Sequence, residues 1–273
     1  MPPKLGILAG RGPLPRRLAE LCRAEGRPVF LLAFDGQTDA ETLADFEHAW
    51  IRLGAVGRGF ELLRAAGVEE LVMAGAMRRP ALSELKPDLA GAAFIAKAGI
   101  SALGDDGLLK AIVRRLEEEG FRVRGVDELI GGLLAPAGVW GRHSPDQQAR
   151  ADIERGLAVV RALGAVDVGQ AAVVQQGLVL GVEAVEGTDV LLQRCAQLRR
   201  DGPGGVLVKI SKPGQERRVD LPTIGLATIE GAAAAGLRGI AVEAGGTLVL
   251  ERAAAVAAAD DVELFLVGLE GEE

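Results

Sequence analysis

The segment KLGILAGRGPLPRRLAELCRAEG, residues 4–26, contains a short apolar run, a glycine pair and an amphipathic stretch. Residues 4–9 have the composition of a buried strand, and Gly10 and Gly12 follow directly. Leucines then recur at helical spacing until Gly26, a residue that commonly ends helices. The segment therefore predicts a strand that turns sharply into a helix, which is the repeating unit of a parallel α/β sheet.

The same alternation continues through the first half of the chain. Further strands are expected at residues 28–34, 49–53, 70–75 and 121–126, with helices at 57–67 and 104–120 and a less regular helical region at 78–100. Short connections between alternating strands and helices indicate a parallel sheet covered on both faces. We therefore predict a Rossmann-like nucleotide-binding domain over residues 1–130.

The second half of the chain has a different pattern. Residues 131–143, GGLLAPAGVWGRH, are predicted to be a linker, and a helix is expected to begin at Ser144 through a capping box. Residues 171–183 predict two strands joined by a hairpin turn at Gln176-Gly177. Helices are expected at 188–198 and 224–236, strands at 204–211, 239–245, 247–251 and 263–268, and a short Ala-rich helix before the last strand. We predict a separate mixed α/β domain over residues 144–273.

Charge and composition exclude several classes of function. The net charge is −7 and the isoelectric point is about 5.1, so general nucleic-acid binding is not expected. Cys22 and Cys195 are far apart, and His48 and His143 stand alone, which argues against disulfides and a structural zinc site. No signal peptide or uncharged apolar run of membrane-spanning length is present, so we expect a cytoplasmic, water-soluble protein.

The turn LAGRGPLP, residues 8–15, is a candidate phosphate site. Backbone N–H groups and the helix dipole at such a turn favour an anion. Asp35 ends the second predicted strand, where dinucleotide-binding domains keep a carboxylate for the ribose. Pro15 stands where the third glycine of GxGxxG belongs, so the fingerprint is incomplete and purely structural glycines remain an alternative.

Two acidic turns are also candidates for the ligand-binding site. Asp105 and Asp106 open a predicted helix, where an N-cap role accounts for one of them. The segment EAVEGTDVLL, residues 183–192, places three carboxylates and a threonine between a strand and a helix. Here too a capping role, for Thr188, is sufficient; the alternative is a polar turn that faces a ligand.

The most unusual stretch is SKPGQERRVDLPTIG, residues 211–225. Its prolines and glycine exclude a helix, and the cation Lys209 interrupts the apolar strand before it. The cations Lys212, Arg217 and Arg218 can neutralise a diphosphate, while Glu216 or Asp220 can hold a divalent cation. A solvated surface loop is the alternative, but we favour an anion site that the prolines preorganise.

Taken in order, the segments LAGRGPLP, GDDGLLK, GQAAVV, EGTD, GVLVKISKPGQERRVDLPTIG and AVEAGG resemble one enzyme family. It is the metal-dependent UDP-2,3-diacylglucosamine pyrophosphatase family of lipid A biosynthesis, the type unrelated to calcineurin-like phosphoesterases. The resemblance runs from about residue 4 to residue 268. One departure is Arg11, where many relatives carry another glycine.

The resemblance implies hydrolysis of UDP-2,3-diacylglucosamine to UMP and 2,3-diacylglucosamine 1-phosphate with Mg²⁺ or Mn²⁺. It also implies a homodimer with transient contact to the membrane surface, at the inner face of the inner membrane. Carried onto this sequence, it implies catalytic roles for Asp220, Lys209, Lys212 and Arg217. Metal ligation is implied for Asp220, Glu186 and Asp189. Substrate binding is implied for Gly10, Gly12, Gly75, Asp105, Asp106, Gln170, Thr188, Gln215 and Thr223.

Asp220 is the residue that we expect to matter most for catalysis, as a metal ligand or as a general base. The alternative is that it merely neutralises Arg217 or Arg218. Two rival functions are a nicotinamide-dependent dehydrogenase, favoured by the glycines and Asp35, and a nucleotide-sensing protein without enzymatic activity.

Overall fold

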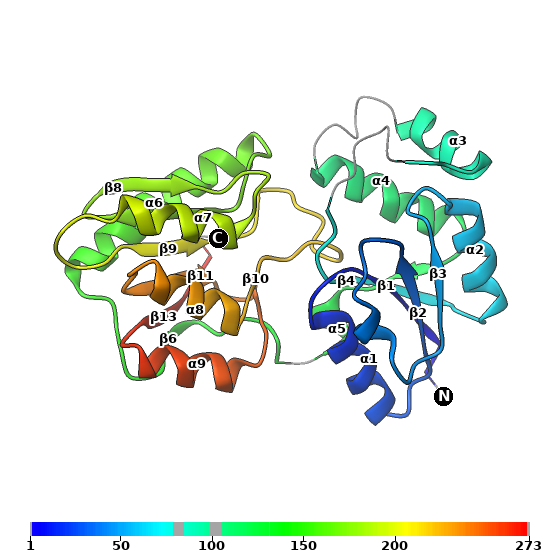
Figure 1. Ribbon diagram of the computed structural model, residues 1–273, viewed down its shortest axis with the longest axis horizontal. Helices are drawn as coiled ribbons and strands as arrows, with labels where there is room; N and C mark the ends of the chain where they lie inside the picture. Colours follow the sequence, from blue (N-terminus) through cyan, green and yellow to red (C-terminus); the bar gives the residue numbers. More distant parts are fainter. Residues whose placement is uncertain (1, 79–84, 99–104, 131, 272–273) are drawn as a thin grey trace. The chain divides into compact units, whose positions relative to one another are not determined.

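The computed structural model describes residues 2–78, 85–98, 105–130 and 132–271, and the chain forms two compact units (Figure 1). Unit 1 comprises residues 1–131 and 216–220. Unit 2 comprises residues 132–215 and 221–273. The central part of the loop at residues 211–225, called the charged loop below, thus belongs to unit 1, although the chain on both sides of it belongs to unit 2.

Unit 1 is built on a five-stranded parallel sheet in the order β3-β2-β1-β4-β5. The strands are β1 (Leu5–Ala9), β2 (Val29–Phe34), β3 (His48–Ile51), β4 (Glu70–Ala74) and β5 (Arg122–Val123). The connecting helices are α1 (Leu14–Ala24), η1 (Ala40–Leu43), α2 (Val56–Ala65), α3 (Leu89–Ala98), α4 (Asp105–Glu118) and α5 (Val126–Leu129). This is the strand order of Rossmann-type sheets, and the order reverses between β1 and β4.

Helices cover both faces of this sheet. One apolar cluster joins sheet residues such as Leu32 and Leu71 to Phe60 of α2 and Leu116 of α4. Helices α1 and α5 lie on the other side of the sheet (Figure 1). Coverage on both sides explains why the strands read as continuous apolar runs rather than as alternating patterns.

Unit 2 is built on a six-stranded mixed sheet in the order β6-β13-β11-β9-β7-β8. Its strands are β6 (Gly138–Trp140), β7 (Ala171–Gln175), β8 (Leu178–Val182), β9 (Val206–Lys209), β11 (Gly239–Glu243) and β13 (Phe265–Leu269). Strands β9, β11 and β13 run parallel to one another, and the other three pair antiparallel. A separate parallel pair is formed by β10 (Thr223–Ile224) and β12 (Leu248–Val249).

The two faces of this second sheet are covered by different helices. Helix α6 (Gln147–Ala165) packs on one face, and α7 (Thr188–Leu198), α8 (Leu226–Ala234) and α9 (Arg252–Asp261) pack on the other. The α/β class, the parallel first sheet and the mixed second sheet are as predicted from the sequence.

Some details differ from the sequence-based expectations. Part of the predicted linker forms β6, which pairs with β13, and Leu134 forms a bridge with Leu248, so most of residues 131–143 belongs to unit 2. Helix α6 begins at Gln147 rather than at Ser144, and its cap is the Asp146 carboxylate, which accepts from the Ala149 N–H at 2.8 Å. Elements of two to four residues, such as β10 and α5, are too short to leave a periodic pattern.

Both cysteines are free and buried, as expected for small core residues, and burial raises the pKa of the Cys22 and Cys195 thiols. Within the described residues, no helix combines the length and the apolar composition that crossing a bilayer requires.

Close packing of α6 on the second sheet depends on a glycine. Gly156 is buried in the middle of α6, and a Cβ there would lie 2.5 Å from Cγ2 and 2.9 Å from Cβ of Val208. We predict that Gly156→Ala lowers the free energy of unfolding by about 1–3 kcal/mol, because the added methyl group overpacks the core against Val208. This loss outweighs the higher helix propensity of alanine. Urea denaturation measures the change.

The exposed Ala158, on the same helix, provides the control. Ala158→Gly should cost about 1 kcal/mol through helix propensity alone. A Gly156→Ala protein more stable than the wild type would show that α6 can move away from β9 without cost.

Candidate functional site

Lys209 is a buried cation at the carboxyl end of β9, with only 7% of its surface exposed. Its Nζ donates to the Thr188 hydroxyl at 2.9 Å and to the Thr223 carbonyl at 3.1 Å. Thr188 begins α7 and Thr223 begins β10, so two further elements hold the ammonium group. Burial of a charge is tolerated only with such partners. The structure thus brings together three residues that the sequence predicted for the site.

Glu183 supplies the opposite charge in this corner of unit 2. It is 5% exposed, its Oε1 accepts from the Thr188 hydroxyl at 2.6 Å, and its Oε2 accepts from the Gln170 N–H at 3.1 Å. Because the Thr188 proton goes to the carboxylate, the hydroxyl oxygen is left to accept from Lys209. Thr188 therefore links Glu183 to Lys209 rather than capping α7, whose N-cap is Gly187.

Strand register explains why these groups meet. Ala171 pairs with Lys209, and Ala172 pairs with Val182, so Gln170 and Glu183 extend from the same edge of the sheet as the end of β9. The Gln170 Oε1 atom is buried and has no hydrogen-bond partner among the described residues. A buried acceptor of this kind calls for a donor from a ligand or a water molecule. Substrate binding by Gln170 stays a prediction, and this unpartnered oxygen is the atom that could serve it.

A second carboxylate, Glu243, sets the direction of the charged loop where it leaves the sheet. It ends β11, and its Oε2 accepts from the Ser211 N–H at 3.0 Å. The Ser211 hydroxyl donates to the Gly246 carbonyl at 2.9 Å, and a Cβ on Gly246 would lie 2.5 Å from Glu243 Cδ. Sequence reasoning missed Glu243 and Ser211 as site residues. The signal was present, because an acid that ends a predicted strand is followed there by Ala-Gly-Gly.

The first half of the loop is anchored within unit 2. Lys212 Nζ forms an ion pair with Asp167 at 2.6 Å. Gln215 is 8% exposed, and its Oε1 accepts from the Lys212 N–H at 2.8 Å, which closes a turn. Both predicted site residues thus help to hold the loop; their roles toward substrate remain predictions. Asp167 was not foreseen, since a lone acid after a helix carries no distinguishing pattern.

The second half of the loop is anchored on unit 1. The Glu216 N–H donates to Asp106 Oδ1 at 3.1 Å, and Asp106 also pairs with Lys110 at 2.6 Å. Val219 packs against the apolar cluster that includes residues of α2 and α4. Asp106 was predicted for the site and does contact the charged loop. Asp105 begins α4, but its side chain lies outside the described residues.

Arg218 pairs with one carboxylate of the charged loop and with one carboxylate of α4. It forms a bidentate pair with Glu216, with both N···O distances at 2.9 Å, and pairs with Glu117 at 2.6 Å. The Arg218 hydrogen bonds lower the pKa of the Glu216 carboxyl, and Glu216 and Glu117 together raise the pKa of Arg218. Glu216 is thus engaged as an ion-pair partner, and Arg218 has two carboxylate partners other than Asp220.

The predicted phosphate turn is occupied by the protein itself. The Gly10 N–H donates to the carbonyl of Ala74, which ends β4, and the Arg11 N–H donates to the carbonyl of Ala76, both at 2.8 Å. The Gly12 N–H donates to Asp39 Oδ2 at 2.8 Å. A Cβ at Gly10 would lie 2.6 Å from the Ala76 carbonyl oxygen, and one at Gly75 would lie 2.6 Å from the Arg11 carbonyl oxygen. Close approach of the two chain segments therefore accounts for Gly10 and Gly75. An anion can use the Gly12 N–H only if Asp39 moves away.

The predicted metal ligands are divided between the two units. Asp220 belongs to unit 1, whereas Glu186 and Asp189 belong to unit 2, where the Glu186 carboxylate pairs with Arg194. Within the described ranges, no group of three or more His, Cys, Asp or Glu side chains could hold a metal ion. Metal ligation by Asp220, Glu186 and Asp189 stays a prediction, and we derive no catalytic step from a bound metal.

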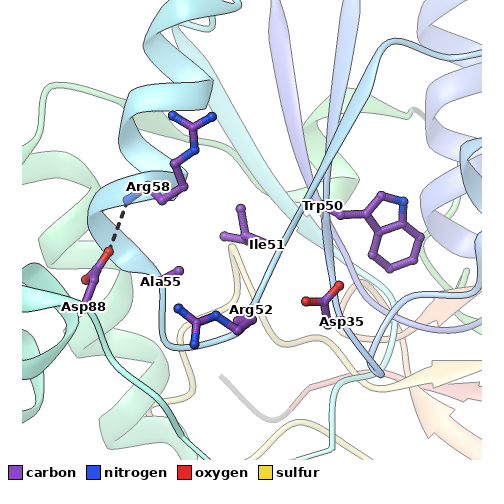
Figure 2. A pocket seen from close by; sticks show the side chains of 7 residues that line it. All are labelled: Asp35, Trp50, Ile51, Arg52, Ala55, Arg58 and Asp88. Carbon is purple, nitrogen blue, oxygen red and sulfur yellow. Dashed lines mark hydrogen bonds between the residues drawn. The ribbon is translucent and has the colours of Figure 1, made fainter.

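Unit 1 contains a pocket of about 430 Å³ at the carboxyl ends of β2 and β3 (Figure 2). Its lining consists of Asp35, Trp50, Ile51, Arg52, Ala55, Arg58 and Asp88. Asp88 also links two helix starts, because it accepts from the Arg58 N–H at 3.2 Å and from the Gly91 N–H at 2.7 Å. Its burial opposes ionisation, but these and other backbone donors outweigh that effect and lower the pKa of Asp88.

Comparison with known proteins covers both units. A family model described as the LpxI N-terminal domain matches residues 4–133, and the LpxI C-terminal domain model matches residues 136–267. The chain is 44% identical over 277 residues to the UDP-2,3-diacylglucosamine pyrophosphatase LpxI of Caulobacter vibrioides. The alignment spans 99% of this chain and 99% of that relative.

The Thr188 hydroxyl can be tested as the link between Glu183 and Lys209. We predict that Thr188→Val lowers the free energy of unfolding by about 1–3 kcal/mol, because the substitution removes one hydrogen-bond partner from each of the buried charged groups Glu183 and Lys209. Thr188→Ser retains the hydroxyl and should stay near the wild-type value. Equal stability of the valine and serine variants in urea denaturation would show that the hydroxyl contributes nothing.

Proposed function

The chain belongs to the LpxI family, and we propose that it hydrolyses the diphosphate of UDP-2,3-diacylglucosamine to UMP and 2,3-diacylglucosamine 1-phosphate. The observation that carries this proposal is 44% identity to a protein of that name along 99% of both chains. Both family domains are matched, so the proposal covers the whole molecule rather than one unit of it.

The reaction requires a water molecule, a way to remove its proton and positive charge around the phosphates. The water oxygen forms a bond to one phosphorus while the bond from that phosphorus to the bridging oxygen breaks, and a base takes the proton. Fixed cations stabilise the charge that develops on the phosphate oxygens. Both kinds of group are present on the charged loop and the strand before it.

We assign the charge-stabilising role to Lys209, Lys212 and Arg217, and the proton-accepting role to Asp220. Support for Lys209 comes from its burial and its two fixed acceptors, which set the position of the ammonium before a ligand binds. Support for Asp220 comes from the docked segment that carries it, where its N–H donates to the Glu216 carbonyl at 3.1 Å. Preorganised groups of this kind are more effective than mobile ones.

We also propose that the reaction requires Mg²⁺ or Mn²⁺. Diphosphate oxygens themselves bind such ions, and Mg²⁺ commonly uses only one or two protein carboxylates together with substrate phosphates. The reaction can therefore require the metal ion without a protein site that has three carboxylates. A metal bound in this way lowers the charge on the diphosphate.

The two rival functions have less support. A nicotinamide-dependent dehydrogenase needs the glycine turn for a pyrophosphate, but the N–H groups of Gly10, Arg11 and Gly12 already donate within the protein. A nucleotide sensor without activity leaves no role for the buried cation and the fixed loop. Release of UMP from the lipid-linked substrate separates the three functions.

Asp220 provides the sharpest test of the proposed reaction. We predict that Asp220→Ala and Asp220→Asn each reduce turnover at least ~10²-fold, the usual scale for loss of an acid–base group, while UMP still binds. Asp201→Ala, at an exposed acid in a loop of unit 2, serves as the control and should retain full turnover. EDTA should abolish UMP release, and added Mg²⁺ should restore it.

Two results would contradict these assignments. Near-normal turnover by a folded Asp220→Ala protein would remove Asp220 from the reaction. Absence of UMP release by the wild-type protein with Mg²⁺ or Mn²⁺ would refute the hydrolase function itself.

We propose further that the protein works as a homodimer that contacts the inner face of the inner membrane transiently. The substrate carries two acyl chains, and Val185, which is 99% exposed, lies two residues beyond Glu183. This exposed apolar side chain is a position at which contact with an acyl chain or a lipid surface can be tested.

Val185→Asp should therefore reduce recovery of the protein with sedimenting phospholipid vesicles, while the mass in solution stays that of a dimer. Equal recovery of the wild type and the variant would count against membrane contact at this position. A monomeric mass for the wild type would refute the homodimer.

A further inference from the structure

We propose that the pocket at the carboxyl ends of β2 and β3 binds the uridine of the substrate, with Trp50 stacking on the base. This inference rests on the proposed function for the identity of the nucleotide. It moves the nucleoside away from the glycine turn, whose N–H groups already have acceptors in the protein. Carboxyl ends of parallel strands are where open α/β sheets bind ligands.

Trp50 is the residue that suggests a base. It lies on the edge strand β3 and exposes 40% of its surface, whereas Trp140 is buried, with 8% exposed. An indole that borders a pocket offers a flat apolar face, on which any nucleobase can stack. Figure 2 shows the indole ring beside Asp35, on the side of β3 opposite to Ile51 and Ala55.

Asp35 and Arg52 are two charged residues of the pocket whose side chains have no partner among the described residues. Asp35 can accept hydrogen bonds from the two ribose hydroxyls, and Arg52 can donate to a phosphate. The other two are engaged, since Arg58 pairs with Glu61 at 3.0 Å and Asp88 accepts backbone N–H groups. The pocket therefore offers one acceptor, one cation and one aromatic face, which are the complements of a nucleotide.

An acyl chain is a poor match for this pocket. Four of the seven lining residues are charged, Asp35, Arg52, Arg58 and Asp88, and burying them against hydrocarbon is unfavourable. The pocket has a volume of about 430 Å³ and is widely open to solvent. Nucleoside chemistry is therefore favoured over lipid chemistry here.

The pocket and the proposed catalytic residue belong to the same unit. Ile51 and Ala55 line the pocket and are members of the apolar cluster against which Val219 packs. Val219 immediately precedes Asp220. A nucleotide held at the pocket is thus bound by the unit that carries Asp220.

Fluorescence of the full-length protein tests the proposal directly, because the chain has two tryptophans and no tyrosine. Titration with UMP, excited where uracil does not absorb, should quench the emission. The quenching should persist in Trp140→Phe and disappear in Trp50→Phe. Trp50→Ala should weaken UMP binding measured by calorimetry about 10-fold, the scale of one lost stacking contact.

A second variant separates the base from the phosphate. Arg52→Gln should weaken the binding of UMP but not of uridine, while Arg17→Gln, which removes an exposed cation of α1 outside the pocket, should change neither. Unchanged UMP affinity in Trp50→Ala, or quenching that survives Trp50→Phe, would overturn the proposal. These binding results are independent of turnover. If the wild-type protein hydrolyses the substrate but Trp50→Ala leaves the UMP affinity unchanged, the pocket is refuted and the proposed function stands.

Discussion

The buried ammonium of Lys209 is the constraint that organises one whole edge of unit 2. A charge at the end of an interior strand is tolerated only if oxygen atoms surround it. Those oxygens come from the start of α7 and the start of β10, and a carboxylate after β8 completes the arrangement through Thr188. The positions of three elements are thus tied to one side chain. The cost of burying the charge is offset by partners that also fix its position.

Sequence reasoning predicted this edge in part. Lys209 was conspicuous because it interrupts an apolar strand, and Thr188 and Thr223 belonged to recognisable segments. Sequence reasoning could not predict which residues strand register brings together. That Gln170 and Glu183 emerge beside Lys209 follows from the antiparallel pairing of β7 with β8 and β9, and no local pattern reports that pairing. Short elements such as β6 were missed for a related reason, since three residues form a strand there only because β13 lies alongside.

The glycine turn shows how one pattern can have two physical causes. Glycines after a first strand permit close approach of a phosphate, but they equally permit close approach of another chain segment. Gly10 and Gly75 face each other where β1 and β4 end, with no room for a Cβ on either. Sequence alone could not separate these causes, because both require the same residue type. The neighbouring Asp35 and Trp50 were harder to connect, since the first ends β2 and the second belongs to the adjacent strand.

The membership of residues 216–220 in unit 1 has a consequence for biosynthesis. A chain emerging from the ribosome presents residues 1–131 long before the five residues that complete this unit. Until residue 220 has been made, Asp106 lacks its loop donor and Val219 is missing from its apolar cluster. Domains usually fold as they are synthesised, beginning at the amino terminus. Here the first unit is completed only after most of the second has been synthesised, so completion of the first unit is a late event.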